Sequence, residues 1–375
     1  MNTTVDQAAS AVRHALKTAG AGLVEREALC ELIALAAVAR EHLLVIGPPG
    51  TAKSEAVRRV SKALGAQTFE YLLGRFTEPN EIFGPVDLAR LREGVVETRT
   101  EGMLPEAELA FLDEVFLGST AILNTLLAML NERVYRRGHT AMKVPLRVCI
   151  GASNAIPDDE ALAAFADRFV LRTFVRPVGD PLIEDLLIGG WGLSEVEAVA
   201  SLEDLDCLAE AARAADPTGV RPLLAHAVRK LRAAGIDLSD RRIVKCQRLT
   251  AAAAVLAGRS APGPEDLWPI VYAVPSPEGQ QLARDALREL LAASENEALS
   301  AAAVEASLGP AARATRIADA AEAMLAERPD QPTEDWTLRL EGIVREIDAG
   351  FAVDALPDRL APIRAQIVEI LGPPG

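Results

Sequence analysis

The stretch from residue 42 to residue 54, HLLVIGPPGTAKS, constrains the fold more than any other part of the sequence. A short apolar run meets a turn rich in glycine and proline, and Lys53 and Ser54 then open a helical pattern. This order predicts a buried strand, a phosphate loop and a helix. Gly47 and Gly50 let backbone N–H groups curl around an anion. The alternative is an ordinary Gly/Pro turn before a helix, which the preceding strand and the Lys-Ser pair disfavour.

The loop matches a Walker A motif with one departure. Lys53 is placed to reach the terminal phosphates and the Ser54 hydroxyl to ligate Mg²⁺. The residue before the lysine is Ala52, where the general pattern has glycine. We expect a helical position there, which alanine tolerates. The residues predicted to form the phosphate site are Gly47, Pro48, Pro49, Gly50, Thr51, Ala52, Lys53 and Ser54.

A pair of carboxylates follows farther along the chain, at a separation that fits within one domain. The apolar run of residues 109–112 ends in Asp113 and Glu114. At the end of a strand, Asp113 can hold Mg²⁺ through water, and Glu114 can polarise a water for attack on a γ-phosphate. Adjacent buried carboxylates need a cation or solvent nearby. Two exposed loop carboxylates are the alternative, which the upstream phosphate loop disfavours.

Three more positions carry polar groups that suit the same chemistry. Asn154 follows the strand pattern VCIGAS and can orient the attacking water, although asparagine after a strand is often a turn former. Arg168 in ADRF is either a surface ion pair or an arginine finger. Arg241 and Arg242 in LSDRR open a helix, where cations are mildly disfavoured, so an anionic partner or a solvated helix end is indicated.

Strand and helix patterns alternate in the first half of the chain, which predicts an α/β fold. The order implies a parallel five-stranded sheet with right-handed crossovers and a ligand at the carboxyl ends of the strands. A hairpin pattern around Glu93-Gly94, from residues 86–91 to residues 95–100, interrupts the alternation. The predicted strands are residues 43–46, 67–73, 109–112, 144–152 and 170–175.

Two proline-rich breaks, at residues 176–181 and 274–279, divide the remaining sequence, and no strand pattern recurs after the first. We therefore expect a nucleotide-binding core with N-terminal helices, an all-α lid and an all-α C-terminal domain. Their predicted bounds are residues 1–178, 179–275 and 276–375.

The formal net charge of −15 disfavours a broad nucleic-acid surface, so we expect protein partners and no nucleic acid. The four cysteines and four histidines show no metal-ligand spacing. The N-terminus lacks a signal-peptide pattern, and no apolar run approaches membrane-spanning length. We therefore expect a cytoplasmic protein without membrane insertion.

As a set, the segments GPPGTAKS, FLDE, GASN, DRF and SDRR resemble the motifs of AAA+ ATPases of the MoxR class, and most of all its RavA-like subgroup. They are similar to Walker A, Walker B, sensor 1, the arginine finger and sensor 2. Two stretches are the most telling, FGPVDLARLREGVVETRTEGMLPEAELAFLDE and ILNTLLAMLNER, and the first resembles the helix-2-insert hairpin. The resemblance covers residues 20–275 and fades after residue 280.

The resemblance implies ATP and Mg²⁺ as cofactors and ATP hydrolysis as the activity. Lys53 and Ser54 would bind phosphate and Mg²⁺. Asp113 would hold Mg²⁺, Glu114 would be the catalytic base and Asn154 would be sensor 1.

The resemblance also assigns roles to arginines. Arg168 would reach into the site of a neighbouring subunit, which implies a homo-oligomeric ring, most often a hexamer. Arg241 would be sensor 2 and close the lid on the γ-phosphate, with Arg242 as the alternative. Arg75, near the end of the second strand, would couple pore contacts to the site.

Family members often act beside a protein with a von Willebrand factor A domain, so the expected function is remodelling, maturation or metal insertion of a protein client. A different class stays open, a nucleotide-gated binding module that presents its C-terminal helices to a partner. A metal chelatase would need a partner subunit. A nucleic-acid motor is disfavoured by the acidic charge.

Overall fold

Five parallel strands form the central sheet, in the spatial order β2-β3-β6-β1-β7. The computed structural model describes residues 4–157, 159–326, 328–329, 333–350 and 356–371. The parallel five-stranded sheet confirms the predicted α/β core. The strands of the sheet are β1 (Leu43–Ile46), β2 (Thr68–Leu72), β3 (Leu109–Asp113), β6 (Val148–Ser153) and β7 (Leu171–Phe174).

Both faces of the sheet are buried, which explains the unbroken apolar runs in its inner strands. In β1, Leu43 and Val45 belong to one hydrophobic core, while Leu44 and Ile46 belong to the other. Strands β3 and β6 alternate in the same way. Because the strands are parallel, their carboxyl ends meet at one edge of the sheet, where a ligand site is expected.

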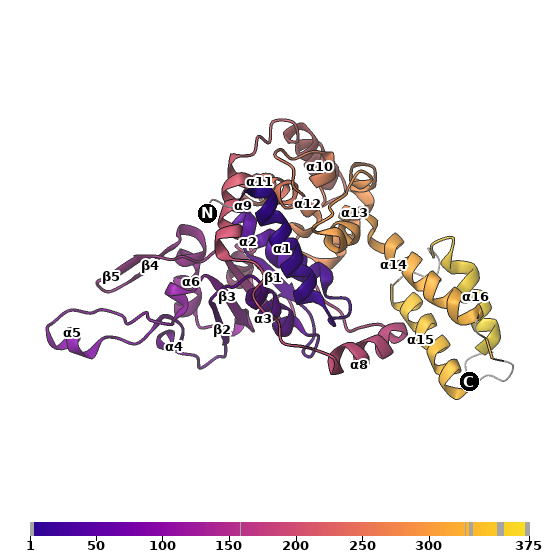
Figure 1. Cartoon of the computed structure of the whole chain (residues 1–375), viewed down its shortest axis with the longest axis horizontal. Coiled ribbons are helices and arrows are strands. Elements are labelled where there is room, and N and C mark those ends of the chain that lie inside the picture. The colour runs from indigo at the N-terminus through magenta and orange to yellow at the C-terminus, as the bar shows by residue number, and fades with distance from the viewer. Residues whose placement is uncertain (1–3, 158, 327, 330–332, 351–355, 372–375) are drawn as a thin grey trace.

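The N-terminal helices share the first core with one face of the sheet and with helices of residues 179–275, the region predicted to be a lid. Helices α1 and α2 pack against α9 and α11, as Figure 1 shows. Helix α13 and the first part of α14 also belong to this core, so apolar packing does not divide the chain at residue 276. The helices with residues in this core are α1 (Val5–Gly20), α2 (Glu27–Ala39), α3 (Lys53–Ala63), α9 (Leu202–Ala214), α10 (Arg221–Ala233), α11 (Asp240–Leu256), α12 (Pro269–Tyr272), α13 (Pro277–Leu291) and α14 (Ser300–Ala326).

The second core lies on the opposite face of the sheet and is built mainly on α6. Ser119 caps the N-terminus of this helix by accepting a hydrogen bond from the backbone N of Ile122. Short elements complete the layer. They are η1 (Leu104–Glu106), η2 (Val115–Leu117), α4 (Pro79–Phe83) and α7 (Glu160–Ala166), whereas α6 itself spans Thr120–Glu132.

In the hairpin predicted around Glu93-Gly94, a short helix replaces most of the first strand. Its two arms meet at a single antiparallel bridge, Val86 with Thr98, and α5 (Leu88–Arg92) occupies the expected first strand. Asp87 explains the difference, because its side chain accepts hydrogen bonds from the N–H groups of Ala89 and Arg90 and so starts a helix. In Figure 1 this insert projects from the sheet beside a second hairpin, β4 (Val134–Arg137) with β5 (Thr140–Lys143), which the sequence analysis missed.

Strand β6 begins later than predicted. The expected start at residue 144 is wrong, because Val144 and Pro145 belong to the connection from β5 and β6 begins at Val148. Proline cannot donate to a strand ladder, which accounts for the delay. The apolar spacing of residues 158–166 predicts a short helix; α7 begins at Glu160, and Asp158 lies outside the described residues.

The C-terminal end of the chain has a core of its own, formed by the later part of α14 with α15 (Glu334–Gly350) and α16 (Leu360–Leu371). Helix α15 contacts the segment that leaves the sheet, η3 (Asp180–Leu182). Arg345 pairs with Asp180, and Arg339 pairs with Glu184. The C-terminal helices are therefore fastened to the start of the lid.

Helix α8 (Ile183–Trp191) follows η3 and lies apart from the two large cores (Figure 1). Trp191 is 95% exposed, and Leu187 and Ile188 are exposed as well. The backbone of Gly189 approaches that of Gly22 closely enough that a Cβ on Gly189 would lie 2.5 Å from the Gly22 carbonyl oxygen. Within the described ranges, no helix combines the length and the apolar character that crossing a bilayer requires.

Candidate functional site

The phosphate loop begins where β1 lies between β6 and β7. The backbone N of Gly47 donates to the carbonyl of Ser153 at 3.1 Å, and a Cβ on Gly47 would lie 2.3 Å from the carbonyl oxygen of Val175. Only glycine fits such a close approach. Gly50 has a φ of 78°, which also favours glycine. The glycines of the motif are therefore explained by the backbone path itself.

Ala52 adopts a left-handed conformation with a φ of 58°. The expectation of a helical position is wrong, because α3 begins at Lys53 and Ala52 is its N-cap. A residue with a Cβ pays about 1 kcal/mol for this conformation, which glycine avoids. This cost explains why the general motif has glycine at this position. In this chain, other contacts must stabilise the left-handed conformation of Ala52.

Lys53 is the first residue of α3 and is only 7% exposed. Its Nζ donates to the carbonyl oxygens of Gly47 at 2.7 Å and Pro48 at 2.9 Å. Burial lowers the pKa of Lys53, and the charges of Asp113 and Glu114 act in the opposite direction. The acid pair therefore lies close enough to the lysine for its field to act there. Ser54, the next residue of α3, is partly buried beside it.

The acid pair and Asn154 meet at the ends of two neighbouring strands. β3 ends at Asp113, whose Oδ1 accepts a hydrogen bond from the backbone N of Glu114 at 2.9 Å. Glu114 has a φ of 50°, which turns the chain sharply out of the strand. The Nδ2 of Asn154, just after β6, donates to Glu114 Oε1 at 2.5 Å. The structure thus brings together Lys53, Asp113, Glu114 and Asn154.

The donor set at this edge fits a magnesium ion. The Ser54 hydroxyl and the Asp113 carboxylate supply the hard oxygen atoms that Mg²⁺ prefers. Throughout the described ranges, no three His, Cys, Asp or Glu side chains gather into a metal cluster. Mg²⁺ would therefore take its remaining ligands from phosphate oxygens and water, as is usual at phosphate-transfer sites.

Arg168 lies at the opposite edge of the sheet. β7 starts at Leu171, which pairs with Leu43, whereas the phosphate loop follows Ile46, which pairs with Phe174. Strands advance about 3.3 Å per residue, so the length of β7 alone separates the two edges by about 10 Å. Arg168 precedes β7, is half-buried, and its Nε finds no hydrogen-bond partner in the described part of the chain.

Arg241 joins Arg168 at this amino edge. Its Nη1 lies 3.9 Å from Oδ2 of Asp167, the residue before Arg168. The Arg241 side chain is 38% exposed. This placement lies away from the phosphate loop of the same chain, and the role of Arg241 as sensor 2 at a γ-phosphate stays a prediction. The predicted site residues therefore fall into two groups, one at each edge of the sheet.

Arg242 holds the core and the lid together. It is 2% exposed and donates to Asp167 Oδ1 at 2.7 Å. Its remaining donors reach the carbonyl oxygens of Phe169, Val170 and Ala273. With every side of its guanidinium engaged, Arg242 is not available to a ligand, which leaves Arg241 as the freer of the two arginines.

Residues 10–210, more than half of the chain, match the bpMoxR family, described as the MoxR domain in the MoxR-vWA-beta-propeller ternary systems. The matched region holds the phosphate loop, the acid pair, Asn154 and Arg168. The chain belongs to this MoxR family.

Relatives of this MoxR chain include two uncharacterized proteins of Methanocaldococcus jannaschii. MJ0812 is 35% identical over 245 residues and MJ0079 is 37% identical over 247 residues. Each alignment covers 65% of this chain and 66% or 64% of the relative, so the chain spans just under two thirds of the length of these relatives. A crystal structure of a "putative ATPase" from Cytophaga hutchinsonii has the same fold, with a TM-score of 0.61 at 15% identity, over 78% of this chain and 96% of that one.

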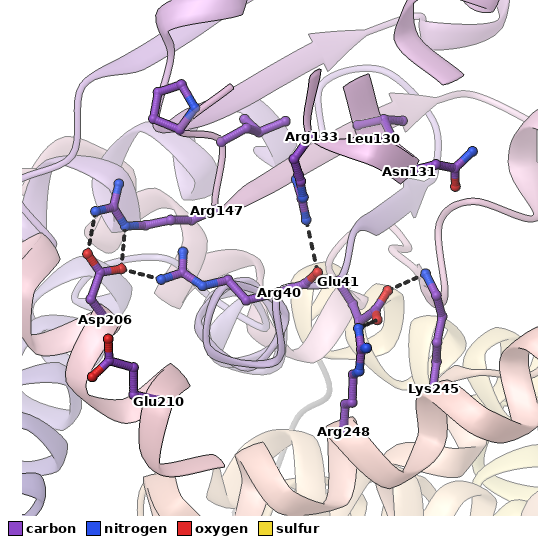
Figure 2. A pocket seen from close by; sticks show the side chains of 12 residues that line it. Arg40, Glu41, Leu130, Asn131, Arg133, Arg147, Asp206, Glu210, Lys245 and Arg248 are labelled. Carbon is purple, nitrogen blue, oxygen red and sulfur yellow. Dashed lines mark hydrogen bonds and ion pairs between the residues drawn. The ribbon is translucent and has the colours of Figure 1, made fainter. Parts of the chain in front are cut away.

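A cavity of about 710 Å³ lies at the amino edge of the MoxR sheet, and Figure 2 shows side chains that line it. Among the described residues that line it, none belongs to the phosphate loop. Core residues form one wall, and residues of α9 and α11 form the other. Asp206 of α9 pairs with Arg40 and, through both carboxylate oxygens, with Arg147. These contacts join the lid to the core.

A second paired carboxylate lies in the same cavity. Glu41 is 1% exposed and pairs with Lys245 Nζ at 2.5 Å and Arg248 Nη1 at 3.3 Å, both from α11. Arg133 donates to the carbonyl oxygen of Arg40 at the end of α2. Glu41 and Asp206 each hold two cations, so the cavity is a fastened joint between core and lid, and the candidate site remains at the carboxyl edge.

Arg26, which no sequence pattern predicted as a site residue, contacts the phosphate loop. Its Nε donates to the carbonyl oxygen of Thr51 at 2.8 Å. No local signal marks this arginine, because the residues it joins lie 25 and 150 positions away in the chain.

Proposed function

We propose that this MoxR protein is an ATPase whose active site is the carboxyl edge of the sheet. The observation that carries the proposal is the contact of Asn154 with Glu114 beside the buried Lys53, since it joins two strand ends at the phosphate loop. Residues 47–54 would hold the phosphates of ATP. Ser54 and Asp113 would hold Mg²⁺.

The groups at this edge suit hydrolysis of a γ-phosphate. Mg²⁺, when bound, neutralises charge on the phosphate oxygens. Glu114 accepts a proton from the attacking water, and the Asn154 amide fixes the carboxylate that does so. Lys53 exchanges its two bonds to loop carbonyls for bonds to phosphate oxygens, so the entering nucleotide replaces contacts that the lysine already makes.

We propose that Arg168 and Arg241 serve the site of a neighbouring copy. Both lie at the amino edge, on the far side of the sheet from their own phosphate loop. An arginine that stabilises transition-state charge must touch the transferred phosphoryl group. A ring of copies, most simply a hexamer, would bring these arginines to the next phosphate loop. The resemblance to the RavA-like subgroup supports the same assembly.

Exposed apolar surface supports a role with protein partners. Trp191 and Ile188 on α8 are exposed, as are Phe76 after β2 and Leu88 on the insert. On α8 the exposed apolar residues lie together on one helix, which is the kind of patch that marks a surface for another protein. They are Ile183, Leu186, Leu187, Ile188 and Trp191. Because the family is named for MoxR-vWA-beta-propeller systems, we propose that the partner has a von Willebrand factor A domain.

In this proposal, ATP turnover drives remodelling, maturation or metal insertion of a protein client in the cytoplasm. Residues 1–178 would bind nucleotide, residues 179–275 would act as the lid, and residues 276–375 would carry contacts to other proteins. Arg75, beside the exposed Phe76, would link client contacts to the nucleotide.

The test is ATP hydrolysis by the purified chain, with and without Mg²⁺, beside Glu114→Gln. We expect Mg²⁺-dependent turnover by the wild type and its loss in the variant, with ATP binding kept. ATP binding without turnover, in a wild type that still recruits its partner, would favour the nucleotide-gated binding module instead. Turnover stimulated by DNA or RNA would favour a nucleic-acid motor.

A further inference from the structure

Arg26 joins three separate segments of backbone at the phosphate loop. The side chain is 5% exposed and lies at the N-terminus of α2. Its Nε donates to the carbonyl oxygen of Thr51 at 2.8 Å, its Nη2 to that of Arg176 at 2.8 Å, and its Nη1 to that of Glu25 at 2.6 Å. These carbonyls belong to the phosphate loop, to the segment that leaves β7 for the lid, and to the entry into α2.

The bond to Thr51 acts on the peptide that carries the strained residue of the loop. Thr51 and Ala52 share one planar peptide, so fixing the Thr51 carbonyl toward Arg26 places the N–H of Ala52 on the opposite side of that plane. Ala52 holds a φ of 58° without the freedom of glycine. The arginine therefore supplies a restraint on the peptide at the position where the general motif relies on glycine.

The guanidinium also brings positive charge to the loop. The neighbouring carboxylate of Glu27 acts on Arg26 through its charge, whereas the guanidinium donates its hydrogen bonds, within the described residues, to carbonyl oxygens, and the charge of Arg26 acts in turn on Lys53. Burial lowers the pKa of Arg26 itself. A buried cation that bonds only to carbonyl oxygens gains from an anion nearby, and the phosphates of a nucleotide would supply one.

We propose that Arg26 is a positioning residue for nucleotide binding, which holds the Thr51–Ala52 peptide in its anion-binding orientation and links that peptide to the segment leaving the sheet at Arg176. This proposal depends on the proposed function, because it assumes that a nucleotide binds at the phosphate loop. A lysine at position 26 would keep the charge but could not form the three-way planar fork, so the geometry would be lost.

Arg59 offers a matched control. It is also 5% exposed, and its guanidinium also donates to backbone carbonyls, those of Thr18, Ala19, Ala21 and Ser194. None of these carbonyls belongs to the phosphate loop. Arg26→Lys and Arg59→Lys therefore remove similar bonds, but only the first releases the loop.

The experiment measures Mg-ATP affinity by calorimetry, KM and kcat for ATP, and the free energy of unfolding without nucleotide, for the full chain and both variants. We expect both variants to lose stability alike, while Arg26→Lys weakens ATP binding about tenfold, as expected for two lost hydrogen bonds, and Arg59→Lys less than about twofold. For Arg26→Lys, KM should rise in step while kcat changes little. Equal weakening by both variants would reduce Arg26 to a packing role.

A second pair of variants tests the restraint on Ala52 itself. In an Ala52→Gly background the loop no longer needs Arg26 to hold a strained alanine, so Arg26→Lys should cost less in ATP affinity there than in the wild type. An equal cost in both backgrounds would overturn the link to Ala52. If the wild type bound no ATP at all, the proposed function would fail as well. If the wild type bound ATP and Arg26→Lys bound it equally well, only this inference would fail.

Discussion

The two edges of the sheet use charged residues in different ways. At the amino edge, the buried carboxylate of Glu41 holds two cations, and Asp206 holds two more across the joint with the lid (Figure 2). At the carboxyl edge, Lys53 bonds to backbone carbonyls, and Asp113 accepts a bond from the backbone of the next residue. In the described structure, neither of these two forms an ion pair.

The two arrangements of charge serve different purposes, since one holds parts of the fold together and the other leaves charge available to a ligand. The closely paired charges of the cavity, Glu41 with Lys245 and Asp206 with Arg147, hold two parts of the fold together and have little left for a ligand. Charges that bond only to neutral backbone keep their field available for a partner of opposite sign, here phosphate and Mg²⁺. The cavity at the amino edge and the phosphate loop at the carboxyl edge illustrate the two cases within one domain.

The largest effect should come from Glu114→Gln. The amide keeps the shape of the side chain but cannot take a proton, so turnover should fall by about a hundredfold or more while ATP still binds. Steady-state hydrolysis and calorimetry check the two parts. Glu132→Gln, an exposed residue that pairs with Arg136, is the control and should keep wild-type turnover. Turnover in Glu114→Gln close to that of the wild type would contradict the role of this carboxylate.

Replacing one lysine at each edge with alanine compares the two cations directly. Lys53→Ala should weaken ATP binding by about a hundredfold, because two charge-assisted bonds to phosphate are lost. Lys245→Ala at the amino edge should leave ATP affinity within about twofold of the wild type, because its charge is already paired with Glu41. The comparison breaks if the two variants lose ATP affinity alike in the same titration.

The amino edge should show its effect in stability. Glu41→Ala removes two charge-assisted bonds, to Lys245 and to the largely exposed Arg248, and should lower the free energy of unfolding by about 2 kcal/mol. Denaturant unfolding measures this change, and ATP affinity should stay near that of the wild type. Glu132→Ala, which breaks only an exposed pair, should cost less than about 0.5 kcal/mol. A stability loss no greater than the control's would mean that the joint does not fasten the lid.

Glu31 sharpens the comparison because it is a buried carboxylate held by backbone N–H groups, those of Ala301 and Ala302 at the start of α14. Burial raises the pKa of Glu31 to about 7 in the folded chain. The folded state therefore binds its proton more tightly than the unfolded state. The resulting stabilisation is fully present below the ordinary carboxyl range and is lost as the pH rises through about 7.

Glu31→Gln removes this titration. Between pH 5 and pH 8, the free energy of unfolding of the wild type should fall by about 2 kcal/mol more than that of the variant. Unfolding curves at several pH values measure the difference in slope. Parallel pH profiles for the two proteins would show that Glu31 titrates normally.

The carboxyl edge could be predicted from sequence because its signals are local. A strand, a glycine turn and Lys53 follow one another directly, and Asp113 and Asn154 each end a recognisable strand. The amino edge could not be predicted, because Glu41 and Lys245 are 204 positions apart. Pairings at such distances depend on how the lid packs against the core, which no short pattern encodes.

Two predictions from short sequence patterns failed because another interaction outweighed the pattern. The side chain of Asp87 started a helix where alternating apolar residues indicated a strand. Ala52 took a left-handed conformation that the alanine itself disfavours, within a loop whose path is set by Gly47 and by the bond from Arg26. The placement of Arg241 beside Asp167 likewise followed from the docking of the lid.

The most direct test of the account is a mixing experiment. Arg168→Ala and Glu114→Gln, each expected to be inactive alone, are coexpressed with different tags, and mixed assemblies are purified through both tags. If neighbouring copies share each site, some interfaces combine the intact Glu114 of one copy with the intact Arg168 of the next, and ATP hydrolysis returns to a substantial fraction of the wild-type rate. Mixed assemblies that hydrolyse ATP no faster than either variant alone would contradict the shared site.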